Sequence, residues 1–303
     1  MVTKSKLPRY TKTACLISGG ADSDIMLDII YRSSKDNVDY VFCDTGIEYN
    51  ATKEHLKYLE DTYNIKIKIC KPIKSIPTCC KEYGVPFFSK YVSDMIQRLQ
   101  RHNFQWEDEP FEVLYDKYPK CKTALQWWCN NHSKGSHFNI NTNKYLKEFM
   151  ILNPPPKISD KCCMYTKKIV AQKFLQEGKY TFRCTGVRKA EGGIRATTYK
   201  NCFTLHDDKP YDDYRPIFWF TNEDRKHYED FFKIKHSDCY EKYGLKRTGC
   251  VGCPYNSRFE EELEIVKQYE PKLYKAVINI FGEAYEYTRK YRQFKQEFNS
   301  KND

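Results

Sequence analysis

Short apolar runs alternate with amphipathic segments in the N-terminal part of the chain. Thr13–Ile17 and Val38–Cys43 are apolar runs of strand length, and Ile65–Cys70 alternates apolar with charged residues. The segments between them, Asp24–Tyr31 and Thr52–Tyr63, space their apolar residues as helices do. Strands that alternate with helices in this order predict an α/β fold with a doubly wound parallel sheet.

This alternation weakens between about residues 72 and 156, a stretch that closes with Pro154, Pro155 and Pro156. We interpret the stretch as a helical insertion.

The alternation resumes after the prolines. A helix is expected from about Thr166 to Gln176 with Gly178 as its stop signal, and a strand over Thr181–Val187. A further strand is expected over Arg215–Phe220, followed by a helix through about Lys233 that Thr221 and Asp224 cap.

Near the C-terminus, apolar residues recur at spacings of three and four, which predicts a long helix with one apolar face. A helix docked on the core is favoured, and the seam of a homodimer is the alternative, because the repeat covers only three to four heptads. The sequence thus predicts an α/β domain over residues 1–255, which contains the insertion, and a helical extension over residues 256–303. The apolar face comprises Leu273, Val277, Ile280, Ala284, Tyr287, Tyr291, Phe294 and Phe298.

Composition and charge indicate which kinds of partner the chain binds and in which cellular compartment it is expected. The chain has 303 residues, a net charge of +11 and no apolar run of the length that a membrane span needs. The positive balance suits phosphates or nucleic acid. Because no signal-peptide core follows the N-terminus, we expect a cytoplasmic protein whose 14 cysteines are thiols or metal ligands.

The strand Thr13–Ile17 leads directly into a glycine-containing hexapeptide before the first helix. Two glycines allow backbone amides to approach phosphate oxygens, and the helix N-terminus adds donors and a positive dipole end. The serines add hydroxyl donors, and Asp22 is placed to hold Mg²⁺ against the phosphates. A phosphate-binding loop is therefore predicted here, and it is not a Walker A loop. Its residues are Ser18, Gly19, Gly20, Ala21, Asp22 and Ser23.

Three segments in order resemble motifs of one superfamily, that of the ATP pyrophosphatases and phosphoadenosine-phosphosulfate (PAPS) reductases. Ser18–Ser23 resembles its S-G-G-x-D-S loop, and Asp44-Thr45-Gly46-Ile47-Glu48-Tyr49 resembles the D-T-G-x-E-[FY] stretch of the reductase branch. Gly186–Arg195 is similar to the G-x-R-x-x-E-S-x-x-R segment, except that Gly192 replaces the usual serine, and Ala21 stands where many relatives carry lysine.

The resemblance implies the adenine nucleotide alpha-hydrolase-like, Rossmann-like fold. It also implies binding of ATP, adenylyl sulfate (APS) or PAPS. Besides the loop, the nucleotide-binding residues that it implies are Asp44, Thr45, Gly46, Gly186, Arg188 and Arg195.

Four cysteines form a candidate metal site: the tandem pair Cys162-Cys163 and the C-x-x-C motif of Cys250 and Cys253. Four thiolates suit zinc or a [4Fe–4S] cluster, and a tandem pair fits the larger cluster better. The segments around them are similar to the cluster-binding cysteines of adenylyl-sulfate reductases, which implies the same cluster. Cys79-Cys80, a second tandem pair without a matching motif, is expected to be structural.

The chemistry is less closely defined than the site. Sulfonucleotide reductases attack the sulfate with a cysteine near the C-terminus, and no cysteine follows Cys253 here. An internal thiol, with Cys239 as the candidate, must replace it, or the reaction differs.

Three hypotheses follow, the first being favoured. It is a PAPS-reductase-like enzyme with iron–sulfur-assisted sulfur chemistry on ATP or an adenylyl sulfate. The second is an ATP pyrophosphatase that adenylates a nucleic acid or protein acceptor for sulfur insertion. The third is a non-catalytic sensor of nucleotide or redox state.

Overall fold

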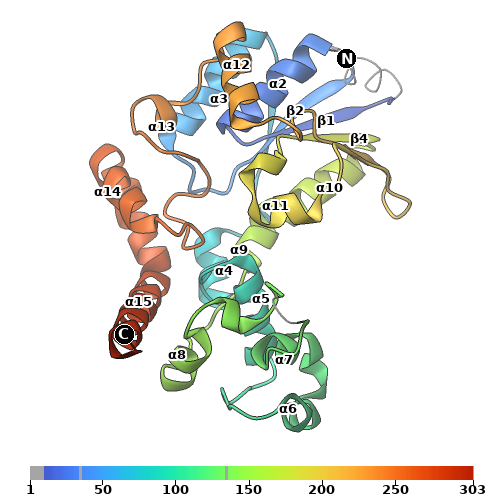
Figure 1. The fold of residues 1–303 in the computed structure, drawn as a ribbon. Helices are drawn as coiled ribbons and strands as arrows, with labels where there is room; N and C mark the ends of the chain where they lie inside the picture. Colours follow the sequence, from blue (N-terminus) through green and yellow to red (C-terminus); the bar gives the residue numbers. More distant parts are fainter. Residues whose placement is uncertain (1–9, 34–35, 134–135, 303) are drawn as a thin grey trace. The chain divides into compact units, whose positions relative to one another are not determined.

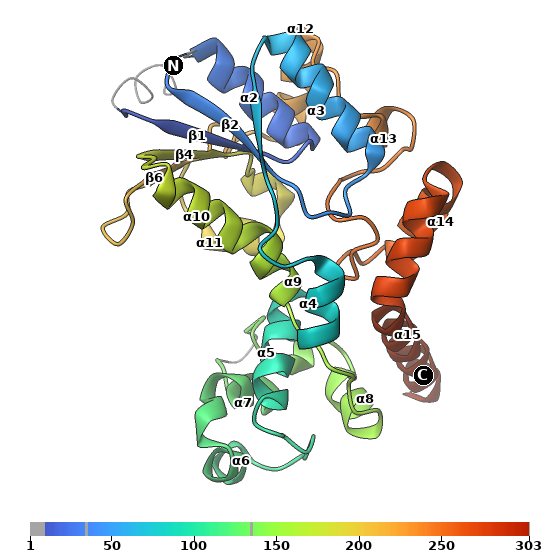
Figure 2. The same ribbon diagram turned by 180° about the vertical axis from the view of Figure 1, so that it is seen from behind.

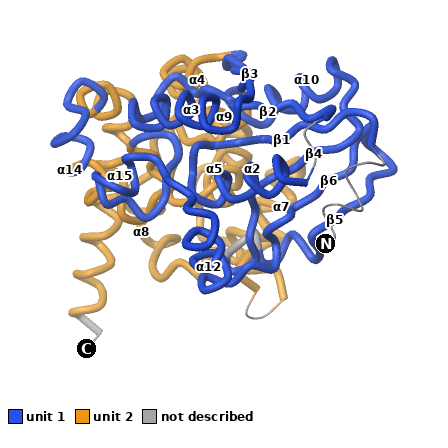
Figure 3. Tube along the Cα trace, turned by 90° about the horizontal axis from the view of Figure 1, so that it is seen from above, with its two compact units in different colours: residues 1–73, 165–251, 265–273 blue, residues 74–164, 252–264, 274–303 orange. Residues whose placement is uncertain are grey.

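The computed structural model describes residues 10–33, 36–133 and 136–302. The chain divides into two compact units, which Figure 3 colours separately. Unit 1 comprises residues 1–73, 165–251 and 265–273, and unit 2 comprises residues 74–164, 252–264 and 274–303.

Unit 1 contains a six-stranded sheet of order β3-β2-β1-β4-β6-β5. All neighbouring strands pair in parallel except β5 and β6, which are antiparallel. The order reverses beside β1, because the chain first adds strands on one side of it and later on the other; ligands bind at such a switch point in open α/β sheets. The strands are β1 (Thr13–Ile17), β2 (Val38–Cys43), β3 (Ile67–Cys70), β4 (Phe182–Thr185), β5 (Phe203–Thr204) and β6 (Asp212–Tyr214).

Helices cover both faces of this sheet, as Figures 1 and 2 show from opposite sides: α2, α3 and α12 lie on one face, and α10 and α11 on the other. The alternation of β1 explains the two cores. Cys15 and Ile17 point into the cluster that contains Met26 and Leu27 of α2, whereas Ala14 joins the cluster on the opposite face. The helices of unit 1 are α2 (Ala21–Ser33), α3 (Asn50–Tyr63), α10 (Ile169–Glu177), α11 (Gly193–Thr198), α12 (Asn222–Phe232) and α13 (Asp238–Glu241).

The start of α12 has the local chemistry that its sequence predicts. The Thr221 hydroxyl accepts from the Asp224 amide at 3.1 Å, and the Asp224 carboxylate accepts from the Thr221 amide at 2.8 Å. This reciprocal capping box satisfies amides that the first turn leaves without partners.

Unit 2 is helical. Its core collects apolar side chains from α5, α7 and α8 together with Tyr287 and Tyr291 of the C-terminal helix. Gly84 ends α4 at φ +104°, and a Cβ there would lie 2.1 Å from the Lys157 carbonyl oxygen, so this close approach requires glycine. The helices of unit 2 are α4 (Ile76–Tyr83), α5 (Lys90–Gln100), α6 (Phe111–Lys117), α7 (Lys122–Trp128), α8 (Leu146–Leu152) and α9 (Lys161–Cys163).

Two helices follow near the C-terminus, α14 (Phe259–Tyr269) and α15 (Pro271–Asn302), and the boundary between the units falls within both. The long helix predicted there is present, and Tyr287 and Tyr291 bury its apolar face in unit 2. No helix in the described part of the chain is both long and apolar enough to cross a membrane.

The domain boundaries differ from the predicted ones. The helical segment that was predicted over about residues 72–156 extends over 74–164, and it shares a compact unit with most of the C-terminal helix rather than being an insertion beside a separate extension. The physical reason is that both segments contribute aromatic rings to a common core. The ring centroids of Phe149 and Tyr287, for example, lie 5.0 Å apart.

The strand predicted over Arg215–Phe220 is wrong. That segment forms turns, in which the Phe218 amide donates to the Arg215 carbonyl and the Phe220 amide to the Ile217 carbonyl. Pro216 has no amide to donate to a neighbouring strand, so the last strand ends before it, at Tyr214.

Candidate functional site

The loop Ser18–Ser23 joins the end of β1 to the first turn of α2. Gly19 has φ +66°, and a Cβ at this position would lie 2.7 Å from Cγ2 of Thr52. The loop closes on itself, because the Ser23 amide donates to the Gly20 carbonyl at 2.8 Å and the Ser18 amide donates to the Ser23 hydroxyl at 3.0 Å. Gly19 therefore permits both the left-handed turn and its close packing on α3.

A cavity of about 280 Å³ lies over this loop. Four of its lining side chains are cationic (Arg188, Arg225, Lys246 and Arg247) and two are acidic (Asp22 and Glu191), an excess of two positive charges. The first turn of a helix adds amide donors and a positive dipole end. This combination favours a polyanionic ligand. The other lining residues are Ser18, Gly20, Ala21, Ser23, Gly186, Tyr240 and Thr248.

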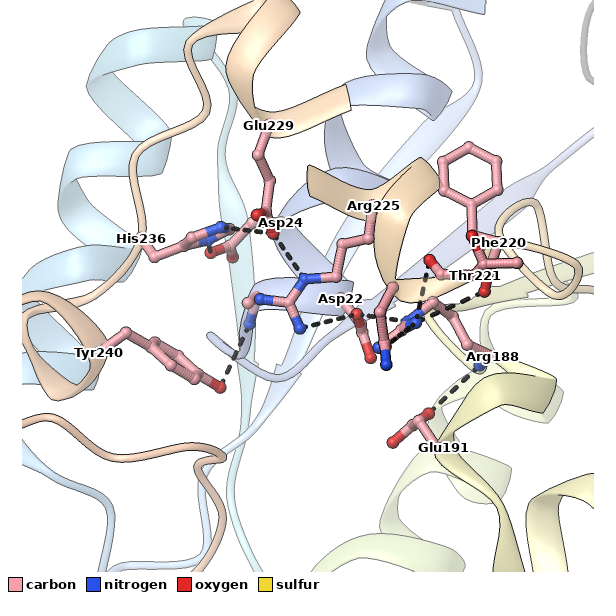
Figure 4. A network of polar contacts seen from close by, with 12 residues as sticks. Asp22, Asp24, Arg188, Glu191, Phe220, Thr221, Arg225, Glu229, His236 and Tyr240 are labelled. Carbon is pink, nitrogen blue, oxygen red and sulfur yellow. Dashed lines mark hydrogen bonds and ion pairs between the residues drawn. The ribbon is translucent and has the colours of Figure 1, made fainter. Parts of the chain in front are cut away.

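The loop aspartate is engaged within the protein, as Figure 4 shows. The Arg188 Nε donates to Asp22 Oδ1 at 2.8 Å, and an Arg225 Nη lies 3.6 Å from the same oxygen. Arg188 also donates to the side chain of Asn222 at 3.1 Å. Burial raises the pKa of Asp22 despite the neighbouring arginines. Arg188 thus fixes the loop, and it lines the cavity while doing so.

Beneath the loop, a chain of buried polar contacts continues from α2 to α12 (Figure 4). Asp24 Oδ2 accepts from His55 at 3.0 Å and from His236 Nδ1 at 2.9 Å. The opposite ring nitrogen of His236 contacts Glu229 at 3.0 Å, and Glu229 in turn accepts from Arg225 at 2.6 Å. These contacts join α2, α3 and α12, and two of these helices, α2 and α12, supply residues that line the cavity.

His236 carries a proton to unusually high pH in this network. Burial alone would lower its pKa, but the hydrogen bonds to Asp24 and Glu229 outweigh burial and raise the pKa of His236 to about 9. An imidazolium between two carboxylates is the stable arrangement.

This pKa predicts how stability changes with pH. The folded-state pKa of His236 lies above the ordinary value of 6.5, so the folded protein binds one more proton than the unfolded chain between about pH 6.5 and 9. The stabilisation is complete below pH 6.5 and is lost as the pH rises through 9. Urea unfolding at several pH values should show this fall, and His236→Gln should flatten it. An equal fall in both proteins would contradict the assignment.

Other residues that the resemblance implied lie at the carboxyl end of β2, and none of them is among the described residues lining the cavity. The Asp44 carboxylate accepts from the Gly46 amide at 2.8 Å and from Lys71 at 2.7 Å. Thr45 is buried and donates to Glu48 at 2.7 Å. In this structure they form the turn after β2.

The segment after β4 contains further residues that the resemblance implied. Gly186 lines the cavity, and a Cβ there would lie 2.9 Å from the Asp22 carbonyl oxygen. Arg195 is on α11, but its side chain lies outside the described residues. Conversely, Arg225, Lys246 and Tyr240 line the cavity although no motif pointed to them; the Tyr240 hydroxyl accepts from the Ala21 amide at 3.3 Å.

The predicted metal ligands are found in both units. Cys162, Cys163 and Cys253 belong to unit 2, and Cys250 to unit 1. In unit 2 the hydrogen bond from Cys163 lowers the pKa of Cys162, but a hydrogen bond with Cys80 and burial outweigh it and raise that pKa. Cys80, expected to be structural, is thus a neighbour of a predicted ligand.

No three or more His, Cys, Asp or Glu side chains in residues 10–33, 36–133 and 136–302 form a group that could hold a metal ion. The four predicted ligands are divided between the two units, so the cluster and its zinc alternative stay predictions.

The candidate nucleophile Cys239 is fully buried on α13, with its sulfur 3.6 Å from the Thr52 hydroxyl. Burial raises its pKa, and it is not among the described residues that line the cavity. Reactive cysteines have exposed sulfurs and lowered pKa values. The geometry therefore does not support attack by Cys239.

Comparison with known proteins places the loop in a family context. The model of the phosphoadenosine phosphosulfate reductase domain family matches residues 12–106. No curated protein matches the chain. Among solved structures, the chain is similar to phosphoadenylyl-sulfate (PAPS) reductase from Candida auris in its phosphate complex, with 14% identity and a TM-score of 0.47. That alignment covers 82% of this chain and 86% of the other.

Proposed function

Over residues 12–106 the chain belongs to the phosphoadenosine phosphosulfate reductase domain family, and from this premise we propose that unit 1 is the nucleotide-binding part of an enzyme of sulfur metabolism. The nucleotide is an adenine nucleotide (ATP, APS or PAPS). Its phosphate or sulfate end occupies the cavity over Ser18–Ser23.

One observation carries this proposal: the cavity joins a glycine loop, a helix N-terminus and an excess of two positive charges. Main-chain amides contact phosphate oxygens without requiring any particular side chain, so the departure at Ala21 is compatible with binding. Lys246 and Arg247 are the charges with the least internal engagement, whereas Arg188 and Arg225 hold Asp22. We therefore assign direct contact with the anion to Lys246 and Arg247.

The favoured reaction is reduction of an adenylyl sulfate. A thiolate attacks the sulfate sulfur, the nucleotide leaves, and a second thiol then releases sulfite as a disulfide forms. No cysteine is among the described residues that line the cavity, so the thiols come from another molecule. The cavity binds the substrate and presents its sulfate.

The same observation supports a second candidate. Adenylation of an acceptor needs no protein thiol, because an acceptor oxygen attacks the α-phosphorus of ATP and pyrophosphate leaves. The cationic lining would stabilise the charge of that leaving group. The acceptor would be a nucleic acid or a protein, in agreement with the net charge of +11.

Product analysis distinguishes the two reactions. Sulfite release from APS or PAPS with an added dithiol supports the reductase, and pyrophosphate release from ATP supports the adenylating enzyme. In either case Lys246→Gln with Arg247→Gln should lower kcat/KM by about tenfold or more, because each removes a charged contact to the anion. Lys66→Gln, a lysine whose side chain is 90% exposed and which lines neither this cavity nor any other described one, is the control. If the protein binds a nucleotide but turns over neither substrate, the non-catalytic sensor is the hypothesis that remains.

The cofactors predicted from the sequence remain proposals. Iron and acid-labile sulfide in anaerobically purified protein would support a [4Fe–4S] cluster on Cys162, Cys163, Cys250 and Cys253, and zinc in its place would support the alternative. Mg²⁺ would accompany the nucleotide, and Asp22 would have to release its arginine partners to bind it.

A further inference from the structure

Unit 1 contains a second and larger cavity, of about 650 Å³, at the edge of the sheet formed by β5 and β6. None of its lining residues lines the cavity over the nucleotide loop. Its lining includes Arg183 on β4, Asp213 on β6 and Arg215 just after β6. Arg183 and Asp213 are partners in the parallel register of β4 and β6.

The only carboxylate among the described residues that line this cavity is that of Asp213, and it already has partners within the protein. Asp213, which is 3% exposed, accepts from Arg183 Nε at 2.5 Å and from its Nη2 at 2.7 Å. His206 Nε2 lies 2.8 Å from Asp213 Oδ2. Both oxygens of Asp213 therefore have strong partners before Arg215 is considered.

Arg215 is left incompletely satisfied. It is 2% exposed, and its Nη1 donates to the Thr204 hydroxyl at 3.0 Å and to the Asn201 carbonyl at 3.3 Å. Its Nη2 reaches Asp213 only at 3.5 Å, and its Nε is buried without a hydrogen-bond partner. The Tyr199 ring lies 4.0 Å from the guanidinium carbon. A buried cation without full pairing is costly, and burial lowers the pKa of Arg215.

The charge around Arg215 is uncompensated as well. The lining carries Arg183, Arg215, Lys200 and Lys209 against Asp213, an excess of three positive charges. The acidic residues nearby are directed elsewhere: Asp212 accepts from the His206 amide and from Tyr10, and the exposed Asp208 faces His206 at 3.7 Å.

We propose that this cavity is a second anion site, in which a tetrahedral oxyanion (phosphate or sulfate) binds the Nε and Nη2 edge of Arg215. That edge presents two parallel donors, the geometry with which arginine binds such anions. Tyr199 holds the guanidinium plane, and Lys200 and Lys209 attract the anion at the rim. The remaining volume, beside Phe203 and Leu205, accepts an organic group joined to the oxyanion.

Titration with inorganic phosphate in the presence of saturating ATP tests this site, because ATP fills the loop cavity if it binds there. A saturable phosphate signal should persist, and it should weaken about tenfold or more in Arg215→Gln and in Arg215→Lys, since lysine lacks the two-donor edge. Potassium chloride at equal ionic strength is the control. Tighter binding of phenyl phosphate than of phosphate would identify an ester as the ligand, and equal binding would identify the free anion.

Two results would overturn the proposal: no saturable phosphate binding beside ATP, or equal binding by the wild type and both Arg215 variants. If circular dichroism shows that the Arg215 variants do not fold, the double variant Lys200→Gln, Lys209→Gln decides. Both lysines are exposed, so this protein should fold and bind phosphate more weakly. Unchanged affinity in it would equally refute the site. ATP binding is measured in the same samples, so a failure here is distinguishable from a failure of the loop cavity.

Discussion

Asp24→Ala should lower the free energy of unfolding by about 3–5 kcal/mol, the usual effect of removing one partner from a buried ion pair. Asp24 is 1% exposed in the first turn of α2 and accepts from both His55 and His236. Without it, the His236 cation keeps only Glu229 as a partner, and the positive end of the α2 dipole loses a negative neighbour. Urea unfolding of the full chain at pH 7 measures the loss.

Two comparisons make this experiment specific. Asp230→Ala, an exposed aspartate on α12, should change the free energy of unfolding by no more than about 0.5 kcal/mol. Asp24→Asn keeps the size and one acceptor oxygen, so its loss should be intermediate. Equal stabilities of Asp24→Ala and Asp230→Ala would show that the buried network contributes nothing beyond an ordinary surface charge.

Gly186→Ala should disturb binding and stability together. The new Cβ would lie 2.9 Å from the Asp22 carbonyl oxygen and 3.1 Å from the Ser23 Cα, both main-chain atoms that no side-chain rotation can move. The first turn of α2 must therefore shift, which displaces the loop amides. We expect a loss of about 1–3 kcal/mol in stability and at least about a tenfold loss in ATP affinity.

Gly249→Ala is the matched control, because this exposed glycine has nothing within 4 Å of its added Cβ. Its unfolding and its ATP affinity should equal those of the wild type. Should Gly186→Ala behave like Gly249→Ala in both measurements, the close packing of Gly186 on the first turn of α2 would have no functional importance.

Local signals account for the parts of the fold that the sequence predicted well. β1 and β2 have the predicted bounds, since short apolar runs between polar turns leave little freedom in their placement. Thr221 and Asp224 cap α12 as expected, because a capping box depends only on residues three apart. The hexapeptide Ser18–Ser23 was recognisable for the same reason.

Interactions between distant segments account for what was not predicted. Arg225 and Lys246 reach the cavity from elements that follow β4 by many residues, and no local pattern marks them. The buried pairing of Arg183 with Asp213, and the incomplete pairing of Arg215, depend on the register of β4 and β6. Arg188 appeared in the sequence as a ligand residue, and only the fold shows that its guanidinium also holds Asp22.

Calorimetric titration of ATP, APS and PAPS into the wild type, Gly20→Val and Gly249→Val tests the nucleotide site most directly. A Cβ on Gly20 would lie 3.2 Å from both Thr248 Oγ1 and the Tyr240 hydroxyl, so valine would fill the space that the phosphates need. We predict saturable heat for at least one nucleotide with the wild type and with Gly249→Val, and none with Gly20→Val. Saturable heat that persists in Gly20→Val, or its absence from the wild type with all three nucleotides, would contradict the account.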